Sequence, residues 1–420
     1  MSSQQTVVKN AVFLYGLTFS NYFIGLLMFP YLSRVLSVGT FGVIGFATSL
    51  CTVFQMVVEY GFQISTTATI ALCKDSKDEV SRVVSTMTCS RLLLAVVSLA
   101  AFLACCAAIP SLRDHLVALL LFFVDSVVKA LLPDSYFRGI ERMGEITIRS
   151  VAVRSGILVA TLLFVKGDET FLAYPIVMIV FDAVALAWAF LLMRRDGISV
   201  HRVDFDEVVF ALKVGFWFFV SRISASLNSS LGSLFLGMRF APDSFVMGIF
   251  SGATRLSTAA QQMTSPVGDA LYPSMMNRRD YRLFFKTLFA GGGVWLVGCV
   301  CAAALATPLC EIILGPQYTD AGGVLRVLMV GVAFGFFSYL FGYPALSPLG
   351  KAKEANIGIM VSTIASLALF VMLWVTDNIT LESVCVVVST MNAISFAYRF
   401  VVFCKAWRKE TLQSRAGSDI

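Results

Sequence analysis

The sequence predicts an all-α integral membrane protein with about twelve transmembrane helices in two pseudo-symmetric six-helix bundles. Three features of the 420-residue chain support this fold class: its composition, the spacing of its apolar runs and the distribution of its basic residues. Hydrophobic residues make up 58% of the chain and charged residues 14%, with a mean hydropathy of +0.82. Soluble chains usually have about 45–50% apolar and ~25% charged residues, so the composition excludes a soluble protein.

Apolar runs of about twenty residues, the length that crosses ~30 Å of hydrocarbon, recur along the whole chain. We count twelve of them, at 11–33, 41–64, 86–109, 115–134, 146–165, 171–193, 211–236, 244–265, 287–310, 323–346, 355–376 and 380–404. The chain has no strongly basic start, and no small-residue cleavage site follows the first run. We therefore expect no cleaved signal peptide, and the first helix should remain in the mature protein.

The basic residues predict the orientation in the membrane. If the N-terminus is cytoplasmic, an even number of spans returns the C-terminus to the cytoplasm, and most lysines and arginines fall on that side. The outside loops and helix ends hold few of them: Arg34, Arg113, Lys166, Arg239 and Arg326. The net charge of +6 is thus explained by topology, and it gives no reason to propose nucleic acid as a partner.

Residue types that build metal and hydrolytic sites are sparse. The ten cysteines form no C-x-x-C pair, and the two histidines, His115 and His201, lie near predicted membrane boundaries. No phosphate-binding loop of the Walker type is present in the sequence. We predict no metal site, no cofactor and no ATP hydrolysis, and we expect a protein that is not an enzyme.

The polar segment RRDGISVHRVDFDE at 194–207 divides the chain into halves of six spans each, 1–200 and 201–420. A weak repeat relates the halves, because 34–50 resembles 238–256. Both halves begin on the same side of the membrane, so the repeat is parallel. This arrangement is typical of transporters whose site lies between the halves.

A polar stripe on one helical face recurs in the second and eighth spans. Its members are Thr48, Thr52, Gln55 and Glu59 in the second span, and Ser251, Arg255, Thr258 and Gln262 in the eighth. The seventh span carries Arg222, Ser226, Ser229 and Ser233 on one face with Asn228 nearby, and the first carries Thr18, Asn21 and Gly25. These four spans are the leading helices of the two halves, so we expect their polar faces to line a hydrated central cavity.

A charge at the bilayer centre costs about 2.5–3.5 kcal/mol on insertion scales, so it usually faces protein or water. The charged residues within the spans are Glu59, Asp125, Lys129, Arg154, Asp182, Arg222, Arg255 and Arg399. Several have alternative interpretations, which the sequence leaves open. Asp125 and Lys129 are spaced to neutralise each other, and Asp182 is a candidate partner for one of these cations. Arg154 can snorkel to the interface, and Arg399 is near enough the cytoplasmic end to anchor the topology.

Arg222 and Arg255 are best explained by ligand contact, since each lies well inside its span within a polar stripe. The planar guanidinium binds phosphate through two hydrogen bonds, so we predict an anionic ligand. A polyprenyl tail that carries a pyrophosphate and sugars would fit a cavity open to lipid. Glu59 has no obvious cation nearby in the sequence, which makes it a candidate proton site; the alternative is a neutral or paired acid that braces the bundle.

Five segments of the chain resemble a known family: FPYLSRVLSVGTFGVIGFA (29–47), EYGFQISTTATIALCKDSKDEVSRVVS (59–85), LLPDSYFRGIERMGEITI (131–148), LGPQYTDAGGVLRVLMVG (314–331) and ALSPLGKAKEANIG (345–358). The chain is similar over nearly its whole length to the bacterial polysaccharide biosynthesis family. These proteins are lipid-linked oligosaccharide flippases of the multidrug/oligosaccharidyl-lipid/polysaccharide exporter superfamily. One departure is Ser135, where the family commonly has an aromatic residue.

The resemblance implies a V-shaped, multi-pass protein of the bacterial inner membrane that moves undecaprenyl-pyrophosphate-linked repeat units to the periplasmic leaflet. It also implies polymerase and chain-length machinery as partners downstream, and members that use an H⁺ or Na⁺ gradient, for which Glu59 and Asp125 are the candidates here. We expect Arg222 and Arg255, with Arg154 or Lys129, to hold the pyrophosphate. The polar residues expected to line the cavity are Asn21, Gln55, Ser226, Asn228 and Gln262.

Two other functions compete with this interpretation. The first is a cation-coupled multidrug or toxin exporter of the same superfamily, which would favour acidic and aromatic cavity residues over arginine. The second is a membrane glycosyltransferase or ligase, which would need catalytic carboxylates on long external loops; the longest such loop offers Glu311 and Asp320 only. The GxxxG motif at Gly331 to Gly335 is expected to pack helices within one chain, and we expect a monomer.

Overall fold

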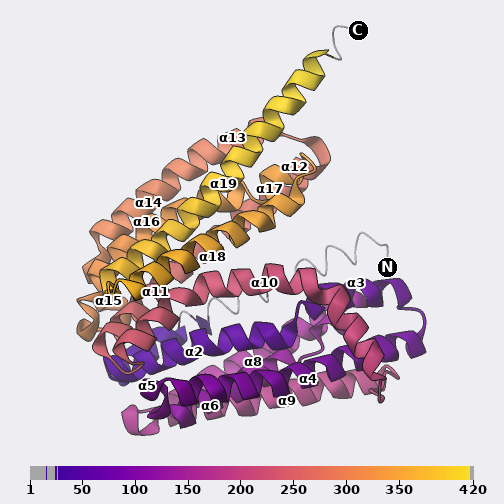
Figure 1. The fold of residues 1–420 in the computed structure, drawn as a ribbon, viewed down its shortest axis with the longest axis horizontal. Helices are drawn as coiled ribbons and strands as arrows, with labels where there is room; N and C mark the ends of the chain where they lie inside the picture. The colour runs from indigo at the N-terminus through magenta and orange to yellow at the C-terminus, as the bar shows by residue number, and fades with distance from the viewer. Residues whose placement is uncertain (1–15, 17–23, 26, 417–420) are drawn as a thin grey trace. The chain divides into compact units, whose positions relative to one another are not determined.

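The computed structural model describes residues 16, 24, 25 and 27–416, and over these the chain is helical with short connections and without β-strands (Figure 1). By their contacts, the residues form two compact units. The first runs to Ser226 and includes Ala241–Asp243, and the second comprises Leu227–Phe240 and the residues from Ser244 onward. The boundary falls inside one long helix, α10 (Phe205–Phe240).

Among the residues that the structure describes, the first unit contains the eight helices α2 to α9, besides the start of α10. They are α2 (Val38–Glu59), α3 (Phe62–Cys73), α4 (Lys77–Ala108), α5 (Pro110–Arg113), α6 (Leu116–Ala130), α7 (Asp134–Gly139), α8 (Met143–Phe164) and α9 (Ala173–Arg195). Helix α2 packs on α4 and α6, and α9 packs on α6 and α8. Phe41, Phe46 and Cys51 of α2 are fully buried, whereas α4 exposes Leu92, Val96 and Leu103. Exposed large apolar side chains on a long helix are the surface that lipid covers.

The second unit is centred on α16 (Ala321–Leu340), which packs against α11, α14, α15 and α19. Its helices are α11 (Phe245–Gln262), α12 (Ser265–Arg278), α13 (Tyr281–Lys286), α14 (Gly292–Ala304), α15 (Ala306–Leu314), α16, α17 (Tyr343–Leu346), α18 (Ala352–Val375) and α19 (Leu381–Ala416). A π-helical turn, Thr287–Gly291, joins α13 to α14. An aromatic core that includes Phe284, Phe336 and Phe341 holds α13, α16 and α19 together.

Ten helices in the described part of the chain are long and apolar enough to cross a membrane, and they coincide with ten of the twelve apolar runs. The first run, 11–33, lies mostly outside the described residues. The eighth run is the helix α11, which is too polar to belong to the ten because its stripe contains Arg255 and Gln262. A transmembrane helix of such polarity needs protein or water on its polar face.

The weak sequence repeat has a counterpart in the helix starts. Ser37 caps α2 by accepting a hydrogen bond from the Thr40 backbone N–H, at 3.2 Å. Ser244 caps α11 in the same way, with the Met247 N–H at 3.2 Å. Both serines have extended backbone angles, as N-cap residues do. Each of the two similar segments therefore contains the capped start of the second helix of its half.

The GxxxG motif packs helices within the chain, as predicted. A Cβ atom on Gly331 would lie 2.9 Å from the Cα of Ser389 in α19, and one on Gly335 would lie 2.7 Å from Nε2 of Gln261 in α11. The absence of a side chain at Gly331 lets the backbones of α16 and α19 approach closely, and its absence at Gly335 leaves room for the Gln261 side chain of α11.

Gly331→Ala is expected to lower the free energy of unfolding by about 1–3 kcal/mol, because the new methyl group meets backbone that has to shift. Gly323→Ala is the matched control on the same helix, since a Cβ there meets open space. The control should be neutral or slightly stabilising through helix propensity. Thermal unfolding of the detergent-solubilised protein measures both; equal melting temperatures would contradict the expectation.

Candidate functional site

Two charged residues predicted to face the cavity meet in the first unit. Nη2 of Arg222, on α10, lies 3.6 Å from Oε2 of Glu59, the last residue of α2. Gln55, one turn earlier, donates its amide to the other Glu59 oxygen at 2.8 Å. Glu59 is therefore a paired acid, which is the alternative that the sequence left open. Its partner comes from a distant part of the chain, which spacing along one helix does not reveal.

A break between α2 and α3 positions this pair. Tyr60 and Gly61 both have positive φ, at 47° and 75°, which ends α2 directly after Glu59. The Tyr60 ring stacks on Phe219 with centroids 4.5 Å apart. A Cβ on Gly61 would lie 2.8 Å from the Cβ of Phe218, so glycine satisfies both the backbone angle and the close approach. The contact of α10 with the end of α2 thus brings Arg222 near Glu59, at the helix end that favours a cation.

Arg222 keeps unused hydrogen-bonding capacity. Its side chain is 31% exposed, and its ion pair with Glu59 is longer than a charge-assisted hydrogen bond. Its Nε is buried without a hydrogen-bond partner among the described residues. On the same helix, Ser226 is buried and the amide oxygen of Asn228 is buried without a hydrogen bond in the described part of the chain. The geometry leaves Arg222 able to donate to an anion.

Arg255 lies on α11 in the second unit, half-buried, with Gln262 exposed further along the same helix. Ser251 on this stripe is buried, and its hydroxyl has no hydrogen-bond partner among the described residues. The helix is N-capped and well packed on α16. That Arg255 and Arg222 line one chamber stays a prediction.

The remaining predicted lining residues have varied surroundings. Arg154 is half-buried on α8 and forms no hydrogen bond or ion pair with the described residues. Asn21 lies outside the residues that the structure describes. Thr48 and Thr52, on the stripe of α2, donate to carbonyls of their own helix at 2.7 Å, so their hydroxyl protons are already used.

Lys129 joins two buried carboxylates. Its Nζ lies 2.5 Å from Oδ2 of Asp125, on the same helix α6, and 3.5 Å from Oδ2 of Asp182 on α9. The pairing of Asp125 with Lys129 and the role of Asp182 as a partner of this cation were both predicted, and both are confirmed. Lys129 is therefore held within the first unit by two acids.

Two further buried arginines were missed from the sequence. Arg149 is 1% exposed and forms an ion pair with Asp134. Arg91 is 3% exposed and donates to the Leu132 carbonyl at 2.9 Å. Both belong to the basic residues that the predicted topology places on the cytoplasmic side, because each lies near the start of an apolar run. The signal that was available is the neighbouring segment LLPDSY, which supplies an acid and the carbonyls at a helix break.

Arg399 also differs from its prediction as a topological anchor. It is 7% exposed and donates to the Ser338 carbonyl at 2.6 Å and to the Ala355 carbonyl at 2.6 Å. Its guanidinium thus links α16, α18 and α19 inside the second unit instead of reaching the membrane surface.

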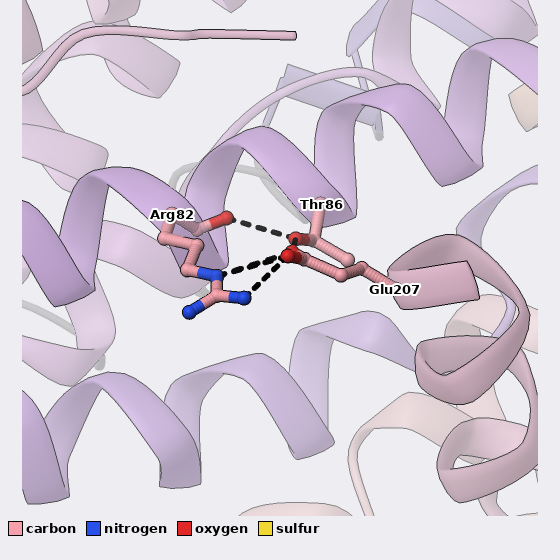
Figure 2. Close-up of polar contacts among 3 residues, drawn as sticks. All are labelled: Arg82, Thr86 and Glu207. Carbon is pink, nitrogen blue, oxygen red and sulfur yellow. Dashed lines mark hydrogen bonds and ion pairs between the residues drawn. The ribbon is translucent and has the colours of Figure 1, made fainter. Parts of the chain in front are cut away.

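The connector between the two halves, residues 196–204, and the start of α10 are held by side chains of other helices in the first unit. Glu207, at the start of α10, pairs with Arg82 on α4 and accepts a hydrogen bond from Thr86 at 3.3 Å (Figure 2). The His201 backbone N–H donates to Ser85 at 2.9 Å. At the other end of the connector, Asp196 accepts from Arg142 at 2.7 Å, and this hydrogen bond raises the pKa of Arg142. These contacts fix the path of the chain from α9 into α10.

The fold and its buried charges define a multi-pass membrane transport protein. Comparison with known protein families identifies one of them. The sequence model of the family described as polysaccharide biosynthesis protein matches residues 7–278. The chain therefore belongs to the polysaccharide biosynthesis protein family, and the resemblance inferred from the sequence is confirmed. A candidate O-antigen transporter of Escherichia coli (strain K12) is 28% identical over 372 residues, covering 86% of this chain and 88% of that protein. A candidate O-antigen transporter of Shigella dysenteriae is 24% identical, covering 82% and 87%.

Solved structures of transporters share the fold. The lipid II flippase MurJ in an inward closed conformation superposes with a TM-score of 0.71 at 13% identity, over 97% of this chain and 91% of that one. An inward-facing multidrug resistance MATE transporter of the MOP superfamily gives a TM-score of 0.64 at 14% identity, over 95% and 96%. The predicted fold class, an all-α membrane protein with about twelve helices, is thus confirmed.

Proposed function

We propose that this protein is a flippase that moves undecaprenyl-pyrophosphate-linked oligosaccharide units from the cytoplasmic to the periplasmic leaflet of a bacterial inner membrane. The observation that carries the proposal is membership of the polysaccharide biosynthesis family, with relatives named for O-antigen transport aligned over more than four-fifths of the chain. The N- and C-termini are cytoplasmic in this proposal, the protein acts as a monomer, and polymerase and chain-length proteins use its product.

Arg222 and Arg255, with Arg154, bind the pyrophosphate in this mechanism, while Lys129 stays paired with Asp125 and Asp182. Support comes from Arg222, whose guanidinium is partly exposed and retains a buried Nε without a partner in the described residues. Serine and asparagine side chains such as Ser226 and Asn228 contact the sugars, while the polyprenyl tail stays in lipid. Alternating access then exposes the headgroup on the other side.

Glu59 acts as the competitor of the pyrophosphate for Arg222. The two charges are 3.6 Å apart, so protonation of Glu59 would release the guanidinium for the anionic cargo. This gives Glu59 a role in ion coupling that depends on its pairing with Arg222.

A second candidate function is the export of organic cations coupled to an ion gradient. The observations that favour it are the fold shared with a multidrug transporter and the two buried aspartates beside Lys129. An organic cation would bind acidic and aromatic groups. The partly exposed ion pair of Glu59 and Arg222 instead includes an arginine, which would repel a cation. We therefore place the anionic lipid carrier first.

Deletion of the gene from its host tests the proposal. Loss of the flippase should stop surface polysaccharide and leave the lipid-linked glycan in the cytoplasmic leaflet, and expression of the intact chain should restore both. Lipid extraction with mass spectrometry identifies the glycan, and its accessibility to a membrane-impermeant glycosidase in oriented vesicles gives the leaflet. Unchanged surface polysaccharide together with increased sensitivity to cationic drugs would instead support the second candidate.

A further inference from the structure

The triad of Asp125, Lys129 and Asp182 has one more negative than positive charge if all three groups are ionised. The side chains of Asp125 and Asp182 are 3% and 6% exposed, and that of Lys129 is 17% exposed. A net charge in such surroundings is costly, and two carboxylates that share one site do not both ionise readily. One additional positive charge would make the triad neutral.

The unsatisfied atoms indicate where that charge binds. Oδ1 of Asp125 is buried without a hydrogen-bond partner among the described residues, and Oδ2 of Asp182 also forms no hydrogen bond with them. Both carboxyl groups contact the same Lys129 nitrogen, which brings them together. If one of the two carboxyl groups is protonated, its O–H can donate a hydrogen bond to the unpaired oxygen of the other.

We propose that Asp125, Lys129 and Asp182 form a proton-binding site in which the two carboxyl groups hold one proton between them. This deepens the ion-coupling part of the proposed function and rests on it for its biological use. Binding converts the triad from one net negative charge to neutral, and release reverses the change. Lys129 is the most exposed member of the triad.

Other titratable groups near the triad do not supply the missing charge. Helix α2 contributes the thiol of Cys51 and helix α4 the thiol of Cys106, which interact with each other beside Asp125. A thiol is neutral or negative, so neither group neutralises a second carboxylate. On α6 and α9 the other charged residues are Arg194 and Arg195, at the end of α9 and about three turns from Asp182.

Infrared spectroscopy of the purified full-length protein in nanodiscs tests the site, because a protonated carboxyl has a C=O stretch distinct from that of a carboxylate. The wild-type protein should show one buried protonated carboxyl at neutral pH, lost on alkaline titration. Asp125→Asn and Asp182→Asn should each abolish the band, since the remaining acid is balanced by Lys129. Lys129→Met should increase the signal from one protonated carboxyl to two.

The control is Glu59→Gln, which removes a carboxyl paired with a different cation and should leave the band unchanged. Absence of the band in the folded wild-type protein would overturn the proposal, and so would its persistence in both asparagine variants. The two asparagine variants decide the question if Lys129→Met fails to fold. The readout needs no cargo, so a failed flippase assay with an intact band would refute the proposed function and leave the proton site standing.

Discussion

Arg222→Gln is expected to abolish surface polysaccharide in a complementation assay while the protein remains at normal abundance in the membrane. The change removes the guanidinium that the cargo pyrophosphate would bind. A hydrogen bond to a charged group contributes about 1.5–3 kcal/mol, which corresponds to roughly 10- to 100-fold weaker binding. Arg222→Lys should retain part of the activity, because it keeps the charge and loses the planar fork.

The same substitution also removes the partner of Glu59, so a second variant is needed to separate the two effects. If Arg222 serves only to neutralise Glu59, the double variant Glu59→Gln with Arg222→Gln restores activity, since neither charge remains. If Arg222 binds cargo, the double variant stays inactive. Arg239→Gln is the matched control on the same helix: this arginine is exposed and pairs with Asp377, and its loss should leave complementation unchanged.

The positions of the membrane-crossing helices were predictable because a lipid environment imposes length and hydropathy on each of them. Ten apolar runs correspond to ten long helices, and the two segments of the weak repeat contain the capped starts of α2 and α11. The GxxxG motif was predictable for a similar reason, since close backbone approach in α16 requires small residues. Internal breaks such as that at Tyr60 and Gly61 were not predicted, because the apolar run continues through them.

The partners of the buried charges were predictable as specific pairs only where one helix supplies both; for Asp182 the sequence indicated a cation as partner but not which one. Asp125 and Lys129 are four residues apart, so their contact follows from helix geometry. Glu59 and Arg222 belong to helices far apart in the sequence, and their contact depends on how α10 packs against the break after α2. Tertiary packing of this kind leaves no periodic trace in one sequence, which is also why the buried ion pair of Arg149 with Asp134 was not predicted.

Arg399→Met is expected to lower the free energy of unfolding by about 1.5–3 kcal/mol, the contribution of hydrogen bonds to a charged group. Ser338 lies in the last turn of α16, where carbonyls have no partner within the helix, and Arg399 supplies two donors to it, one to the carbonyl and one to the hydroxyl. Methionine keeps an unbranched apolar side chain but leaves that carbonyl buried and unpaired.

Arg399→Lys should lose an intermediate amount, because one ammonium group cannot reproduce the planar bridge to carbonyls on both α16 and α18. Arg408→Met is the control, as this arginine is exposed on the same helix α19. Thermal unfolding of the purified protein in detergent compares the three variants with the wild type. A melting temperature for Arg399→Met equal to that of Arg408→Met would show that the bridge does not stabilise the second unit, and that Arg399 is retained for its charge.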